Sequence, residues 1–273
     1  MSEQKAPFTM HLEELRKRLI VTFLTVTTAF LVCFNYSEML YRWLVKPMRE
    51  NLVLSLQEPY LSFVPREIVH ELVFLAPAEA FWMHMKVSLI AGLVISMPVV
   101  FWQVWRFMSP GLHKSEKRMA IPFVFVTSLL FLLGTAFCFI IVLPFAMNFL
   151  LNFRTESLTP MISVERYVDF CLKFIIAFGV IFELPVVMVF LSRMGVVTPG
   201  WLASNRKYAV LAAFIVAALL TPTPDAFNQT LMAVPIMVLY EGGIWSARLF
   251  GRRKGASDEA DEKDNATGNE DPE

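Results

Sequence analysis

Six apolar stretches, each separated from the next by a polar segment, organise this chain of 273 residues. A helix needs about 20 predominantly apolar residues to cross the hydrocarbon core of a bilayer. We interpret the stretches as membrane-spanning helices, with predicted bounds at 19–34, 78–107, 119–145, 168–194, 208–220 and 226–250. The pattern therefore predicts an all-α polytopic membrane protein whose six transmembrane helices lie within residues 1–250.

Two segments do not follow the apolar pattern. Residues 35–77 contain four prolines and short amphipathic pieces but no spanning run, so we expect an ordered cap outside the membrane. Residues 251–273 form an acidic tail, in which eight of the 24 acids of the chain fall after position 257. The tail has no aromatic or branched apolar residue after that position, which predicts a disordered, solvated segment.

The last two apolar stretches are short. Residues 208–220 would span about 20 Å as a helix, against a hydrocarbon core of about 30 Å. The sixth stretch begins with polar residues, and its strictly apolar run covers only 231–240. One explanation is a misplaced boundary; the other is a thin apolar belt that draws the bilayer inward. We favour the second and predict short fifth and sixth helices.

Composition supports a membrane protein. Hydrophobic residues make up 56% of the chain, with 25 Phe and 15 Met, whereas soluble domains have about 45–50%. The three cysteines, Cys33, Cys138 and Cys171, are isolated in or beside apolar stretches. We therefore expect small buried hydrophobic side chains rather than a disulfide or metal set.

The basic residues predict the orientation. With six spans, one side of the membrane carries 16 Lys and Arg residues and the other carries six. Because basic residues are enriched in cytoplasmic segments, both termini are expected in the cytoplasm, and residues 35–77 on the opposite side.

A dense charged stretch at residues 9–19 precedes the first span. Two acids and then three bases lie on a segment whose leucines share one helical stripe. One interpretation is a charged collar that anchors the span, and the other is a docking element at the cytoplasmic surface. The collar would be paired at helical spacing, as Glu13 with Arg16, and Glu14 with Lys17 or Arg18.

The second loop carries a further acid, Glu116, among cations. A plain surface ion pair is the simpler interpretation. However, Glu14 and Glu116 both precede spans on the same predicted side. Two carboxylates held apart in a groove suit two guanidinium groups, which bind carboxylates in bidentate fashion.

Glu183 is the one acid deep inside an apolar stretch. Its side chain either bonds backbone groups freed at Pro185, or provides a polar group for a substrate, a proton or a partner helix. Intramembrane acids are usually functional, so we favour the second. An alternative function follows, a small proton-coupled secondary transporter with Glu183 as proton site. Such transporters often carry inverted repeats, and the sequence shows none.

Catalytic signatures are missing from the sequence. It has no Gly-x-Ser-x-Gly, His-Glu-x-x-His or P-loop motif, and its four histidines form no metal-binding pair. We expect neither an enzyme nor a cofactor or metal site, and no nucleic-acid partner.

Four separated motifs resemble the TatC family, the multispanning signal-receptor subunit of the twin-arginine (Tat) protein translocase. The resemblance covers about residues 10–250. It rests on residues 11–18; on Gln103-Val104-Trp105 with Phe107, Pro110 and Glu116; on Phe178-Gly179-Val180 with Phe182, Glu183 and Pro185; and on Leu220-Thr221-Pro222 with Pro224, Asp225 and Gln229.

The resemblance implies a glove-like concave receptor in the bacterial cytoplasmic (inner) membrane. Such a subunit binds the twin-arginine signal peptides of folded proteins and associates with other copies in a receptor complex. With TatA- and TatB-type single-span partners it moves those proteins across the membrane, using the proton motive force.

The resemblance also implies roles for individual residues. Glu14 and Glu116 would face the arginine pair, with Arg16 and Phe107 supporting them. The neighbouring Glu13 leaves open which acid contacts the arginines. The remaining positions are an intramembrane group at Glu183, partner contacts at Thr221 and Gln229, and periplasmic functional residues at Pro47 and Asp225.

Overall fold

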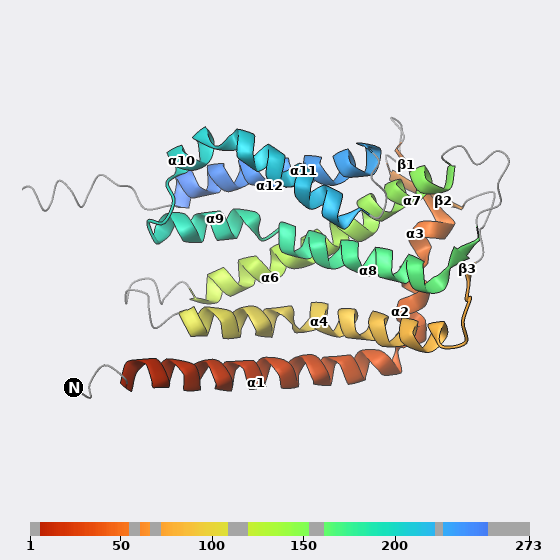
Figure 1. Ribbon diagram of the computed structural model, residues 1–273, viewed down its shortest axis with the longest axis horizontal. Helices are drawn as coiled ribbons and strands as arrows, with labels where there is room; N and C mark the ends of the chain where they lie inside the picture. Colours follow the sequence, from red (N-terminus) through yellow and green to blue (C-terminus); the bar gives the residue numbers. More distant parts are fainter. Residues whose placement is uncertain are drawn as a thin grey trace, which may run out of the picture.

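Long helices lie side by side in the computed structural model of the chain (Figure 1). The structure describes residues 6–54, 61–65, 72–108, 120–152, 161–221 and 226–250. The start of helix α1 and the end of helix α12 lie at the same end of the molecule, and helix α2 and the strands lie at the other (Figure 1). The predicted tail, 251–273, lies outside the described residues.

Helices α1 (Ala6–Asn35) and α4 (Glu79–Met108) are each 30 residues long, and α1 packs mainly against α4. Gly92 permits a close approach between them, since a Cβ atom at this position would lie 2.7 Å from the backbone nitrogen of Phe30. No larger residue fits there unless the two backbones move apart.

The third predicted span is longer than the sequence indicated. Helix α6 (Ala120–Phe137) continues through a five-residue π-helix, η2 (Cys138–Val142), into helix α7 (Leu143–Asn152). The predicted end at residue 145, beside Pro144, is therefore wrong. Proline removes a backbone donor and crowds the carbonyl four residues back. The wide π turn, in which Leu143 N–H donates to the Cys138 carbonyl, relieves that conflict.

The fourth span is divided in two. Helix α8 (Val164–Ile181) ends just before Phe182 and Glu183, and helix α9 (Leu184–Arg193) begins after them. Pro185 lies in the first turn of α9, where its missing N–H costs little because first-turn donors have no partner within a helix. The two-residue interruption therefore sets Glu183 between two helix ends.

The last helices differ in length. A short helix, α10 (Pro199–Ser204), precedes α11 (Arg206–Leu220), which has only 15 residues, or about 22 Å. Helix α12 (Ala226–Phe250) has 25 residues, so the expected short sixth helix is wrong. Its polar start remains helical because Gln229 Nε2 donates to the Phe214 carbonyl of α11 at 3.1 Å.

Short elements occupy the described parts of residues 35–77, the segment for which the sequence predicts a cap. Helix α2 (Ser37–Leu44) leads to α3 (Lys46–Arg49). Strands β1 (Glu50–Leu54) and β2 (Leu61–Pro65) pair antiparallel, with Glu50 opposite Pro65. Strands β3 (Leu72–Val73) and β4 (Ile162–Ser163) pair in parallel and join the cap to the start of α8.

The main core surrounds α8. Cys171, Phe174 and Phe178 are at most 1% exposed, and they join a cluster with residues of α2, α4, α7, α11 and α12. All three cysteines are buried and free, which confirms the prediction that they act as small hydrophobic side chains.

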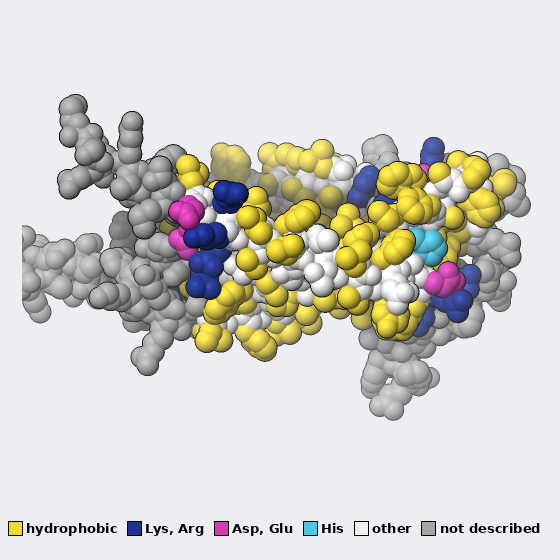
Figure 2. All heavy atoms as spheres, turned by 90° about the horizontal axis from the view of Figure 1, so that it is seen from below, with side chains coloured by type: hydrophobic (Ala, Val, Ile, Leu, Met, Phe, Trp, Pro, Cys, Tyr) yellow, Lys and Arg dark blue, Asp and Glu magenta, His cyan; other side chains and the backbone are white. Residues whose placement is uncertain are grey.

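Five helical stretches in the described ranges are long and apolar enough to cross a bilayer; α11 falls short of that length. They are 12–35, 79–107, 121–151, 164–193 and 226–250. Figure 2 shows apolar side chains over the middle of the face that α1 lines, with charged side chains gathered near the two ends. This banding matches an apolar membrane interior between two aqueous surfaces.

Replacement of Gly92 by alanine should loosen α1 from α4. The added methyl group meets the backbone of Phe30, so we expect Gly92→Ala to lower the free energy of unfolding by about 1–3 kcal/mol. Gly242→Ala in α12 is the matched control, because a Cβ atom there meets nothing within 4 Å. Thermal unfolding in detergent measures both, and equal midpoints for the two variants would contradict the close approach.

Candidate functional site

Glu14 lies in the first part of α1, in an ion pair with Arg18 one turn later. The Arg18 Nη2 atom donates to Glu14 Oε1 at 2.8 Å, and the side chains are only 19% (Arg18) and 31% (Glu14) exposed. The sequence placed these two residues at helical spacing, and this pairing is confirmed. Its partial burial makes it stronger than a fully solvated pair.

Glu13 differs sharply from Glu14. It pairs with Lys17, at 2.9 Å between Oε1 and Nζ, and both side chains are about two-thirds exposed or more. The expected pairing of Glu13 with Arg16 is therefore wrong, because the i, i+4 neighbour takes its place. A solvated pair of this kind contributes little to stability.

Arg18 also connects α1 with α4. Its Nη1 atom lies 3.5 Å from Oε1 of Gln103, which is buried, so the contact joins residues 85 positions apart. Phe107, half-buried, follows one turn later at the end of α4. The Glu14 carboxylate is thus held beside the helix that carries Phe107.

Of the other residues of the predicted arginine site, Arg16 is exposed on α1. Glu116 lies outside the described residues, so the convergence of Glu14 and Glu116 stays a prediction.

Glu183 occupies the break between α8 and α9. It is 9% exposed, and its Oε1 atom is buried without a hydrogen-bond partner among the described residues. Its side chain caps neither helix end, so the simpler explanation from the sequence, bonding to freed backbone groups, does not hold. A buried carboxyl oxygen without a hydrogen-bond partner lowers the stability of the fold. Its presence therefore favours a functional rather than a structural role for Glu183.

The hairpin of α11 and α12 holds the predicted partner contacts. The buried Thr221 hydroxyl donates to the Ala217 carbonyl at 3.0 Å. Gln229 ties α12 to α11 through the Phe214 carbonyl. Pro47 is buried in α3, and Asp225 lies outside the described residues.

A charge cluster that the sequence did not predict joins α4 to α8. Lys86 Nζ lies 2.8 Å from Glu165 Oε1 and 2.8 Å from Asp169 Oδ1. The i, i+4 spacing of Glu165 and Asp169 was the available signal, but their partner lies about 80 positions away in the chain.

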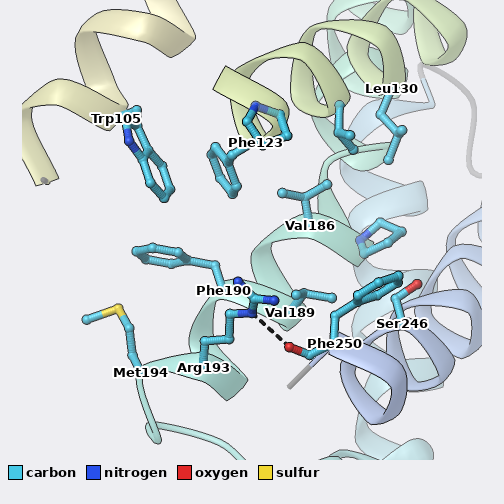
Figure 3. A pocket seen from close by; sticks show the side chains of 13 residues that line it. Trp105, Phe123, Leu130, Val186, Val189, Phe190, Arg193, Met194, Ser246 and Phe250 are labelled. Atoms are coloured by element: carbon cyan, nitrogen blue, oxygen red, sulfur yellow. Dashed lines mark hydrogen bonds between the residues drawn. The ribbon is translucent and has the colours of Figure 1, made fainter. Parts of the chain in front are cut away.

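A cavity of about 400 Å³ opens between α4, α6, α9 and α12. Figure 3 shows Trp105, Phe123 and Phe190 together on one side of it, with Arg193 bonded to the Phe250 carbonyl. The Trp105 ring lies 4.4 Å from that of Phe123, centroid to centroid. This lining suits an apolar group.

The features described so far define a multi-pass membrane protein. No group of three His, Cys, Asp or Glu residues in the described part of the chain has metal-binding geometry. The polar and charged groups instead lie at helix ends, at one helix break and between packed helices.

Comparison with known proteins identifies the family. The profile described as "Sec-independent protein translocase protein (TatC)" matches residues 10–235. The TatC proteins of Desulforapulum autotrophicum and Aquifex aeolicus are each 39% identical. The first aligns over 94% of this chain and 90% of its own length, and the second over 91% and 97%.

A solved structure agrees with this match. The crystal structure of a twin-arginine translocase receptor, TatC, is 38% identical and superposes with a TM-score of 0.72, over 89% of this chain and all of that one. The chain therefore belongs to the TatC family, which confirms the resemblance. It is a component of Sec-independent protein translocation, a transport function rather than catalysis.

Replacement of Glu183 by leucine should stabilise the isolated chain. The substitution removes a buried oxygen that has no hydrogen-bond partner within the described residues, so we expect a gain of about 1–3 kcal/mol. Glu165→Leu is the control, since that carboxylate is paired with Lys86, and it should give no gain. Thermal unfolding in detergent measures the difference, and a lower midpoint for Glu183→Leu would show that the carboxyl group is satisfied.

Proposed function

We propose that this chain is the core subunit and signal receptor of a twin-arginine translocase. It binds the twin-arginine signal peptides of folded proteins and moves those proteins across the membrane with TatA- and TatB-type partners and the proton motive force. The observation that carries the proposal is the partly buried Glu14, held at the contact between α1 and α4. The similarity to the crystal structure of a twin-arginine translocase receptor, TatC, also supports it.

The proposed orientation puts both termini in the cytoplasm of a bacterium, with the chain in its inner membrane. The excess of basic residues on one side supports this. The shared end of α1 and α12 is then cytoplasmic, and α2, α3 and the strands are periplasmic (Figure 1). Six helices cross the membrane in a glove-like receptor, with α11 as a short fifth span that thins the bilayer.

The arginine site consists of Glu14 and Glu116, with Arg16 and Phe107 beside them. Of the two neighbouring acids, we assign the contact to Glu14 rather than Glu13. A carboxylate shielded from water attracts a guanidinium group more strongly than one in bulk solvent, and Glu13 is 66% exposed.

The partner site is separate. The helix surfaces around Glu183, Thr221 and Gln229 contact the signal helix or single-span partner subunits. Several copies of the chain assemble in one complex. Pro47 and Asp225 act on the periplasmic side. The secondary-transporter alternative is not retained, because the chain belongs to a protein translocase family.

Charge reversal of either receptor acid should abolish signal binding. Glu14→Lys or Glu116→Lys places a cation where the signal presents two, so we expect loss of crosslinks from a photoreactive group beside the arginine pair of a signal peptide. Glu13→Lys is the matched control and should retain the crosslinks. Protein levels in the membrane fraction verify insertion. Unchanged crosslinks and export in both receptor variants would defeat the receptor proposal.

Truncation of Glu183 should impair the partner site and leave the arginine site intact. We expect Glu183→Ala to weaken partner association and transport, while binding of the arginine pair stays near wild type. Ser192→Ala is the control, because its hydroxyl is also buried without a hydrogen-bond partner in the described region. Co-purification of partners and signal-peptide crosslinking measure the two effects. Loss of signal binding with intact partner assembly would overturn this division.

A further inference from the structure

The Glu14 carboxylate is already bound to a guanidinium group of the chain itself. Arg18 Nη2 lies 2.8 Å from Glu14 Oε1, which is the charge-assisted contact that an arginine of a signal peptide would make. Bidentate docking of an incoming arginine uses both carboxylate oxygens. It therefore requires Arg18 to give up Oε1.

The guanidinium group of Arg18 does not have a hydrogen-bond partner for every donor. Its Nε atom is buried and has no hydrogen-bond partner among the described residues. Nη1 is 3.5 Å from Gln103 Oε1, at the long end of hydrogen-bond geometry. A guanidinium group with an unmet donor is held less firmly than one in a complete fork. Displacement of Arg18 from Glu14 is therefore feasible for a better-placed ligand.

Gln103 offers the displaced group a second acceptor. Its oxygen comes from the buried side of α4 and already lies beside Arg18. A small movement of the guanidinium group toward Gln103 would shorten that 3.5 Å contact to ordinary hydrogen-bond length. Arg18 can thus leave Glu14 and still keep a hydrogen-bond acceptor, and its side chain, 19% exposed, retains some contact with solvent.

We propose that Arg18 is an internal competitor for Glu14, which masks the receptor acid until an arginine of the ligand replaces it and Gln103 receives Arg18. This inference rests on the proposed receptor function. It adds a residue that limits affinity, so that isolated basic groups bind Glu14 weakly. A ligand that makes several contacts at once can still displace Arg18.

Peptide affinity of the full-length chain in lipid nanodiscs tests the proposal. The probe is a fluorescent peptide with an arginine pair followed by an apolar segment, and anisotropy gives its Kd. We expect Arg18→Gln to bind the peptide roughly three- to tenfold more tightly, in line with a partly buried ion pair. Lys17→Gln is the matched control, since it removes the solvated neighbouring pair, and its Kd should stay within about twofold of wild type.

A double variant separates competition from a structural effect. In the Glu14→Gln background, peptide binding should be weak, and Arg18→Gln should leave it unchanged, because there is no carboxylate left to unmask. Gln103→Leu should act in the opposite direction and weaken binding, because the displaced guanidinium group loses its acceptor. That variant retains Arg18 and carries the test if Arg18→Gln does not fold, as judged by helicity and monodisperse elution.

The outcomes distinguish the two proposals. Weaker or unchanged binding by a folded Arg18→Gln chain overturns the competitor role while the receptor function stands. The competitor role is also overturned if Arg18→Gln lowers the peptide Kd equally in the wild-type and Glu14→Gln backgrounds. Wild-type affinity of the Gln103→Leu chain for the peptide overturns it too. Full peptide binding by Glu14→Gln instead contradicts the receptor role of Glu14, and the inference falls with it.

Discussion

Close packing of α1 on α4 is the contact on which the proposed receptor depends. α1 packs mainly against α4, while large apolar side chains such as Phe23, 70% exposed, face outward. The backbones meet where Gly92 leaves room for Phe30. That approach brings Arg18 to Gln103 and so holds Glu14 beside the end of α4. The position of Glu14, near the start of α1, thus depends on how α1 packs against α4.

The second constraint is the division of the fourth span at Glu183. Hydrocarbon gives no partner to an open backbone or a carboxyl group, so such a break is tolerated only where protein or water covers it. On the N-terminal side of the break, the Lys86 cluster fixes α8 to α4. On the C-terminal side, α9 packs on α12 beside the apolar cavity. The break therefore lies between two well-packed regions. In the proposed receptor, a break at this position is where we expect α8 and α9 to adjust their relative arrangement when a helix binds.

Hydropathy predicted where the long apolar helices lie, because a run of apolar residues is the signal of a membrane-spanning segment. It failed at Pro144, where a π turn lets the helix continue, since the choice between turn types depends on local backbone relief. Helical spacing predicted the Glu14–Arg18 pair. It could not predict the burial of that pair or the Gln103 contact, which depend on how α1 lies on α4. The Lys86 cluster was missed for the same reason, as its partners are brought together only by the packing of α4 and α8. The family motifs pointed to Glu116 and Asp225, which lie outside the described residues, so their roles remain predictions.

The central claim is that Glu14 recognises a guanidinium group of the ligand. A double-mutant cycle tests this most directly, with peptides that carry an arginine pair or a lysine pair and with the wild-type and Glu14→Gln chains. If Glu14 recognises a guanidinium group, the lysine pair binds the wild-type chain more weakly than the arginine pair does, and Glu14→Gln removes at least about 1 kcal/mol of this penalty. The same penalty in both chains would contradict it, because the preference for arginine would then arise elsewhere.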